Sequence, residues 1–376
     1  MTSNKLVRFK HRPDGRPEPS IFAIEEEAIP TVAPGSFLMR TNYLSMDPAL
    51  VSRMRDEDNY VEKVNPGDVM QGYGIAQVIE SKNSAVKVGE IRFGLIGMQE
   101  YCLASAAEEF KKLNLGLAEP TWYLSAVGIT GATAFLSLFD IGNPKAGETV
   151  LVSAGGSSVG SMAAQMAKMK GCRTVAIVST DEKATQVIED SGYDAAISYR
   201  GKSIDQLSAD IGRACPNGVD LYYDNTSGDI SEAVLDHYNI FARSLVIGRL
   251  AISHLMDTRD DIGRRENNAI LANRIRKQGF VLLDYQDKLM GAFIQLAKWV
   301  KTGQLRIKED MALGIESAPD AFFAMLDGRS QGKQLVKLAE IDHQLDPSPR
   351  WLGKLLISPL FPTSWLSRKL CGGIGA

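Results

Sequence analysis

The chain has 376 residues, a formal net charge of −3 and a hydrophobic content of 44%. This length allows two domains with sizeable cores, and the small net charge gives no electrostatic preference for nucleic acid. No stretch approaches the ~18 consecutive apolar residues of a membrane-spanning helix. The first 16 residues lack the apolar core of a signal peptide. We therefore expect a cytoplasmic globular protein.

The first 125 or so residues contain short apolar runs separated by Gly, Pro and Asp, which predicts an irregular, mostly β domain. Residues 37–41 and 75–79 are two such runs, and Ile91 and Phe93 begin another. The charge-dense stretch 53–58 is interpreted as a solvated loop rather than a site.

From about residue 126 the pattern alternates between helices and strands, which predicts a doubly wound parallel sheet. Residues 304–340 return to short strand-like runs, so the α/β domain is expected to be inserted within the first domain. The helices are expected over 128–139, 181–191, 203–214, 230–237 and 289–300, and the strands over 195–198, 219–223, 244–247 and 280–283.

The stretch 149–178 is the clearest unit of this domain. A buried strand at 150–152 is followed by a Gly/Ser turn, an amphipathic helix and a second strand at 173–178. Such a turn directs backbone N–H groups and a helix N-terminus at one point, which suits a phosphate. In G-x-G-x-x-G register, which is typical of dinucleotide binding, the middle glycine is replaced by serine. The residues of the turn are Gly155, Gly156, Ser157, Ser158, Val159 and Gly160.

Several motifs in fixed order now identify a family. The chain resembles the zinc-independent branch of the medium-chain dehydrogenase/reductases, and within it the prostaglandin reductase, 2-alkenal (double-bond) reductase and curcumin reductase family. The resemblance covers residues 5 to 340. It is carried by Tyr43-Leu44-Ser45-Met46-Asp47-Pro48, by 97–101, 141–148, 181–183, 220–225 and 279–285, and by Gly332-Lys333.

The resemblance implies a GroES-like catalytic domain (1–125 plus 311–340), an inserted Rossmann NADP-binding domain (126–310) and a C-terminal extension (341–376), usually in a homodimer. It implies NADPH-dependent reduction of the C=C bond of a small α,β-unsaturated carbonyl compound. By the same resemblance, the residues that line the nicotinamide are Asn225, Gly248, Phe280 and Leu282, with Ser330 in place of the family's asparagine.

The absence of an acidic residue after the second strand also indicates the cofactor preference. NAD sites place Asp or Glu near the end of the second strand to bind the ribose 2′-OH, whereas here Ser179 and Thr180 follow that strand. In the resembled family, the lysine and tyrosine that match Lys183 and Tyr199 hold the 2′-phosphate of NADPH. The alternative is that Lys183 lies on a solvated helix face and that Tyr199 caps a core.

The departures from the family pattern concern the substrate pocket. The family has Tyr and Arg where this chain has Ala49 and Val51, and Pro and Tyr where it has Thr130 and Phe135. The family's pocket Tyr matches Ser253 or His254, and its Val-Gly-Gly matches Thr226-Ser227-Gly228. An enone reduction needs a donor for the enolate oxygen and a proton for the α-carbon. The candidates are His254, because histidine is the residue type suited to proton transfer near physiological pH, followed by Ser253 and Thr130. Each could equally be an ordinary loop or helix residue.

No metal site is predicted. Zinc catalysis needs three protein ligands and an open position, but the four histidines are scattered, and the four cysteines show no ligand spacing. Single buried thiols are expected instead. The cysteines are Cys102, Cys172, Cys215 and Cys371.

Two classes of function remain open. One is the reductase with an altered pocket, and the other is a catalytically impaired nucleotide-binding partner of a biosynthetic complex, suggested by Ser157 and the lost tyrosines. The extension ends in a cationic segment with two tryptophans, Trp351 and Trp365. Such a segment can lie on an anionic membrane, although packing on the protein's own surface or on a partner subunit is the alternative.

Overall fold

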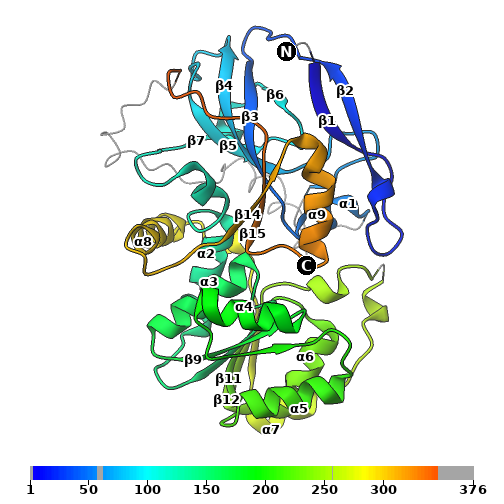
Figure 1. The fold of residues 1–376 in the computed structure, drawn as a ribbon, viewed down its shortest axis with the longest axis vertical. Helices are drawn as coiled ribbons and strands as arrows, with labels where there is room; N and C mark the ends of the chain where they lie inside the picture. Colours follow the sequence, from blue (N-terminus) through cyan, green and yellow to red (C-terminus); the bar gives the residue numbers. More distant parts are fainter. Residues whose placement is uncertain (1–2, 57–61, 256, 346–376) are drawn as a thin grey trace, which may run out of the picture.

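The computed structural model describes residues 3–56, 62–255 and 257–345. These residues form two units, one rich in β-strands and one of alternating strands and helices (Figure 1). From the N-terminus, the chain first forms most of the β unit and then the α/β unit. It returns to the β unit with β14, α9 and β15. This arrangement confirms the predicted fold class, a mostly β domain with an inserted doubly wound domain.

The β unit is organised around a seven-stranded sheet, in which the described strands follow the order β14-β15-β3-β4-β5-β7 and β6 pairs with β3. A separate hairpin is formed by β1 and β2. The elements are β1 (Ser3–Phe9), β2 (Phe22–Ala28), β3 (Phe37–Ser45), α1 (Leu50–Met54), β4 (Tyr73–Ser81), β5 (Ile91–Leu95), β6 (Tyr101–Ala104), β7 (Lys111–Lys112), β14 (Glu309–Leu313), α9 (Ala318–Leu326) and β15 (Lys333–Lys337).

The α/β unit is a parallel sheet whose described strands follow the order β10-β9-β8-β11-β12-β13. The order reverses between β8 and β11, and in such sheets ligands bind beyond the carboxyl ends of the strands at this point. Its elements are α2 (Ile129–Leu136), β8 (Thr149–Ser153), α3 (Ser158–Met169), β9 (Arg173–Val178), α4 (Asp181–Ser191), β10 (Ala195–Ser198), α5 (Ile204–Ala214), β11 (Val219–Asp224), α6 (Gly228–Val234), β12 (Tyr238–Val246), α7 (Asn267–Asn273), β13 (Arg276–Gly279) and α8 (Leu289–Lys301).

One predicted strand is wrong. The apolar run 280–283 is not a strand, because β13 ends at Gly279 and a 3-10 turn spans Leu282–Tyr285. The strand is polar and fully exposed because it forms the edge of the sheet, whereas Phe280 and Leu282 are buried in the core. The apolar run 280–283 therefore indicates burial in the core, but it does not form a strand.

The two units share a hydrophobic cluster. Buried side chains of β4 and β5, among them Ile75 and Phe93, belong to the same cluster as those of α2, β8 and α8. Three cysteines, Cys102, Cys172 and Cys215, are buried and free, as predicted. The fourth, Cys371, lies with Trp351 and Trp365 outside the described residues, so the proposals for the tail stay predictions. None of the described helices combines the length and apolar character needed to cross a membrane.

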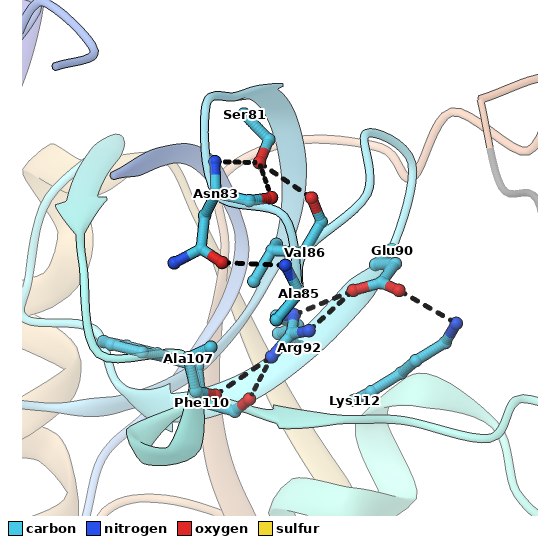
Figure 2. A network of polar contacts seen from close by, with 9 residues as sticks. All are labelled: Ser81, Asn83, Ala85, Val86, Glu90, Arg92, Ala107, Phe110 and Lys112. Atoms are coloured by element: carbon cyan, nitrogen blue, oxygen red, sulfur yellow. Dashed lines mark hydrogen bonds and ion pairs between the residues drawn. The ribbon is translucent and has the colours of Figure 1, made fainter. Parts of the chain in front are cut away.

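An ion network around a buried arginine joins β5 to β7 in the β sheet (Figure 2). The guanidinium of Arg92 donates two hydrogen bonds to Glu90, the shorter 2.7 Å, and Lys112 donates to the other carboxylate oxygen at 3.1 Å. Burial acts to raise the pKa of Glu90, but the bonds from Arg92 and Lys112 outweigh it and the pKa is lowered. Arg92 also donates to the carbonyls of Ala107 and Phe110, so its buried charge is well satisfied.

Candidate functional site

The glycine-rich turn is built so that side chains are excluded from it. A Cβ on Gly155 would lie 2.7 Å from the Cβ of Ala176, and one on Gly160 would lie 2.6 Å from the carbonyl oxygen of Ala154. The hydroxyl of Tyr193 lies 3.1 Å from the carbonyl oxygens of both glycines and ties the turn together. This close packing fixes the shape of the turn, which leads directly into the N-terminus of α3, where a phosphate can bind.

Ser157, the departure from the glycine pattern, caps α3. Its Oγ accepts a hydrogen bond from the backbone N–H of Gly160 at 3.1 Å, which stabilises a helix N-terminus. Ser157 also forms an isolated β-bridge with Gly332 of the β unit. Ser158 begins the helix, and Val159 packs against the core.

A cationic corner lies at the end of β9. Thr180 caps α4 by accepting from the N–H of Lys183, and Ser179 is buried beside Gly328. Lys183 Nζ donates to the carbonyl of Ser330 at 2.6 Å. Its pKa is lowered, first by burial and then by the charge of Arg200.

The backbone N–H of Tyr199 donates to the carbonyl of Val178 at 3.0 Å, which places this residue beside the corner. Its side chain packs against the core cluster that contains Ile177 and Ile197, as the alternative of a core-capping tyrosine expects, so its role at the 2′-phosphate stays a prediction. Sequence reasoning missed Arg200, which follows β10 and adds a second cation to this corner. The first carboxylate after β9, Asp181, accepts a hydrogen bond from Ser198.

The predicted nicotinamide residues are held by a buried carboxylate. Asp224, at the end of β11, is 1% exposed and accepts from the backbone N–H groups of Thr226 and Ser227, at 3.0 and 2.8 Å, and from Ser231 Oγ at 2.6 Å. This network fixes the loop that begins with Asn225, whose side-chain amide donates to the carbonyl of Ser153 at 2.7 Å.

Gly248 packs directly on this loop, since a Cβ there would lie 2.8 Å from the carbonyl oxygen of Asn225. Ser227 has φ 59° and ψ −163°, a conformation usually reserved for glycine, and its hydroxyl donates to the carbonyl of Gly248. The buried residues Phe280 and Leu282 follow the neighbouring strand. Asp224 and Ser227 were noted in the sequence only as part of a family segment and of a departure from it, and were not among the predicted site residues.

These features fit a dinucleotide. The turn has no space for a side chain at Gly155 or Gly160, a 12-residue helix begins within it, and Lys183 lies at the corner beside it. Residues 327–333 of the β unit lie along this edge, through Gly332 with Ser157, Ser330 with Lys183 and Asp327 with Arg200.

Two motifs that are distant in sequence meet next to this edge. The Nζ of Lys333, which is 4% exposed, forms an ion pair with Asp47 and donates to the carbonyl of Met46. Ser45 donates to the other carboxylate oxygen of Asp47 at 2.5 Å. The pair joins the end of β3 to β15 and thereby positions Gly332.

In the described part of the segment 53–58, Asp56 is exposed but the two arginines are not. Arg53 and Arg55 are 2% and 4% exposed. Arg55 donates to the carbonyls of Ser253 and Leu255 in the α/β unit and so connects the two units. The interpretation of these arginines as a charged surface is wrong, because backbone carbonyls and, for Arg53, the side-chain oxygen of Gln71 bind their guanidinium groups in place of water.

The three catalytic candidates do not form one hydrogen-bonded group in the described part of the chain. Thr130 Oγ1 donates to the carbonyl of Ser125, and Ser253 Oγ donates to the carbonyl of Leu250, both at 2.8 Å. His254 is exposed. Each hydroxyl hydrogen is therefore already used within the protein, and the catalytic role of these three residues stays a prediction.

Within residues 3–56, 62–255 and 257–345, no group of three or more His, Cys, Asp or Glu side chains is placed to hold a metal ion. Zinc independence stays a prediction. A polar cavity of about 350 Å³ lies at the opposite edge of the parallel sheet, where Arg243 pairs with Glu148 at 2.6 Å. Its lining includes none of the predicted cofactor residues.

Similarity to known proteins agrees with this site. A family model described as the N-terminal domain of oxidoreductase matches residues 5–113, and one described as zinc-binding dehydrogenase matches residues 158–299. The chain is 34% identical to the NADPH-dependent curcumin reductase of Escherichia coli (strain K12), and 33% identical to the NADP(+)-dependent 2-alkenal reductase of Nicotiana tabacum. Each match covers 90% of this chain and 98% of the relative.

Among solved structures, CurA from Vibrio vulnificus in complex with NADPH superposes with a TM-score of 0.82 at 32% identity, covering 89% of this chain and 99% of that one. The fold and site thus define an oxidoreductase with a Rossmann domain. The chain belongs to the medium-chain dehydrogenase/reductase family, among the NADP(H)-dependent oxidoreductases that include the curcumin and 2-alkenal reductases. The predicted family and its NADPH dependence are confirmed.

Proposed function

We propose that this protein uses NADPH to reduce the C=C bond of a small α,β-unsaturated carbonyl compound. The observation that carries the proposal is the convergence, at one edge of the parallel sheet, of the glycine turn, the Lys183 corner and the Asn225–Gly248 contact, with the Lys333–Asp47 pair beside them. The known substrates in the names of the relatives, curcumin and 2-alkenals, are conjugated carbonyl compounds and support the same reaction class.

Different residues are assigned to different parts of NADPH. The turn 155–160 and the N-terminus of α3 bind the pyrophosphate, and Lys183, Arg200 and Tyr199 surround the 2′-phosphate. Asn225, Gly248, Phe280, Leu282 and Ser330 orient the nicotinamide. NADPH, when bound there, supplies a hydride.

The protein must then stabilise the negative charge that develops on the carbonyl oxygen, and a positioned hydrogen-bond donor does this in the absence of a metal. We propose that the reaction is zinc-independent. Homodimerisation and a cytoplasmic location stay predictions.

The experiment is a substrate panel. Loss of NADPH absorbance is followed with simple enones, enals and dienones, and NADP⁺ reduction is followed with simple alcohols. Turnover of activated alkenes supports the proposal, whereas turnover of alcohols alone shows that the reaction class is wrong. Tight NADPH binding without any turnover favours the nucleotide-binding partner instead.

A further inference from the structure

Tyr73 lies at the end of the β sheet where β3 leads on to Asp47, the partner of Lys333. It is the first residue of β4, beside the last residues of β3, since Gly74 pairs with Leu44. Its ring is partly buried and stacks on Phe93 with 5.5 Å between centroids and an interplanar angle of 3°. The stack fixes the plane of the ring and leaves the hydroxyl as its polar end.

Charged groups from two elements surround this ring. The guanidinium carbon of Arg53, from α1, lies 5.9 Å from the ring centroid. Arg53 is itself held by Gln71 at 2.6 Å and by the carbonyl of Glu62 at 3.1 Å. On the side of β3 lies Asp47, whose negative charge is neutralised by Lys333.

These surroundings keep the phenol protonated. Burial raises the pKa of Tyr73 above its ordinary value, and Asp47 acts in the same direction, whereas the charge of Arg53 lowers it. At neutral pH the group is therefore a hydrogen-bond donor, and Arg53 favours any negative charge that the phenol oxygen acquires.

We propose that Tyr73 is the donor to the carbonyl oxygen of the substrate, in place of the pocket tyrosines that this chain lacks. The inference rests on the proposed function and names the residue that the lost tyrosines leave unassigned. Three features favour Tyr73 over Thr130 and Ser253. It sits next to the Lys333–Asp47 pair that positions Gly332 against the turn, its ring is rigid, and a cation is adjacent.

The step balances as follows. The hydride forms a bond to the β-carbon of the substrate, NADPH is oxidised to NADP⁺, and the π electrons of the alkene shift so that the carbonyl oxygen becomes an enolate. The O–H bond of Tyr73 breaks, and its proton forms the O–H bond of the enol. The phenolate of Tyr73 is stabilised by Arg53 until water returns a proton, and water also completes the tautomerisation of the enol to the saturated carbonyl product.

The test compares Tyr73→Phe with Tyr43→Phe. Tyr43 is also partly buried, lies on the adjacent strand β3 opposite Ile75, and has Lys337 and Glu340 nearby instead of Arg53. Each change removes one phenolic oxygen. We expect Tyr73→Phe to lower kcat/KM for enones by roughly 10²–10³-fold with an unchanged Kd for NADPH, and Tyr43→Phe to leave both unchanged. Thermal unfolding of both variants verifies that they are folded.

A second readout needs no cofactor and no turnover. para-Nitrophenolate carries its charge on an oxygen conjugated to an aromatic ring and so imitates an enolate. We expect it to bind the unmodified protein and Tyr43→Phe, with a shift of its absorbance band, and to bind Tyr73→Phe at least about tenfold more weakly. Unmodified protein that reduces enones while Tyr73→Phe matches it in rate and in nitrophenolate binding overturns the role of Tyr73 alone. Absence of enone turnover by the unmodified protein overturns the proposed function itself.

Discussion

The proposed site has two walls, one from each sheet, and they differ in whether backbone or side chains line them. The wall from the parallel sheet is mostly backbone, shaped by glycines and by strained residues such as Ser227, and fixed from behind by the buried side chains of Asp224 and Tyr193. The wall from the β sheet consists of side chains, namely Tyr73, Arg53, Asp47 and Lys333, which meet from three separate segments of the chain.

This difference suggests a division of labour. A backbone surface suits a ligand part common to all reactions, such as a pyrophosphate, because it is insensitive to most substitutions. A side-chain surface can change with the substrate. Substitutions on the first wall are expected to alter cofactor binding, and substitutions on the second to alter substrate chemistry.

The largest expected effect is on the first wall, at Lys183. Replacement by Glu removes an attraction for the 2′-phosphate and adds a repulsion, each about 4 kcal/mol at most for close charges near a surface. We expect Lys183→Glu to change the ratio of the Kd values for NADPH and NADH by roughly 10³-fold, in favour of NADH. Fluorescence titration with both cofactors measures this ratio.

Lys298→Glu makes the same charge change on the exposed face of α8 and serves as the control. An unchanged cofactor ratio in Lys183→Glu would mean that the 2′-phosphate lies elsewhere.

The next effect separates stability from chemistry within the β unit. Glu90→Gln leaves Arg92 buried without its carboxylate partner, which typically costs about 3 kcal/mol. Urea unfolding is expected to show this loss at neutral pH, with no change in the Kd for NADPH. Lys112→Met, which removes the half-exposed member of the network, is expected to cost less than about 1 kcal/mol.

The same pair predicts a pH dependence. The pKa of Glu90 is lower in the folded protein than the value of about 4.3 in an unfolded chain. Its contribution is therefore present above that pH and is lost as the pH falls through the folded-state pKa. The difference in unfolding free energy between the unmodified protein and Glu90→Gln should shrink in acid, and a difference that grows in acid would contradict the assignment.

The two walls also differ in how well they could be predicted from the sequence. The turn 155–160, the missing acid after β9 and the strand–helix alternation are local patterns, and the structure brings the predicted cofactor residues to one edge. Arg53 and Arg55 looked like surface charges, because the partners that bury them lie outside their own segment: 9 and 18 residues away for Arg53, and about 200 residues away for Arg55. Tyr73 was missed for the same reason, since only the folded sheet places it beside Arg53 and Asp47.

A smaller effect is expected at Ser227, whose φ and ψ cost about 1–3 kcal/mol for a residue with a side chain. We expect Ser227→Gly to raise the free energy of unfolding by about 1 kcal/mol. Ser227→Ala keeps the strain and loses the bond to Gly248, so it should lower that free energy by about 1 kcal/mol. Urea unfolding of both variants decides this, and a Ser227→Gly protein less stable than Ser227→Ala would show that the backbone is not strained.

The smallest effects are expected at Thr130 and Ser253. Because their hydroxyls donate to carbonyls of the protein, we expect Thr130→Val and Ser253→Ala to change kcat/KM for enones by less than about threefold, within 1 kcal/mol. A loss as large as that of Tyr73→Phe in either variant would return the donor role to that residue.

The central claim is hydride transfer from NADPH to an activated alkene, and single-turnover stopped-flow of the NADPH complex tests it most directly. The complex is mixed with an enone, and the saturated product is identified by mass spectrometry. We predict loss of NADPH absorbance in step with the appearance of one equivalent of the saturated ketone. Reduction of the carbonyl to an alcohol, or stable NADPH in the presence of every activated alkene, would contradict it.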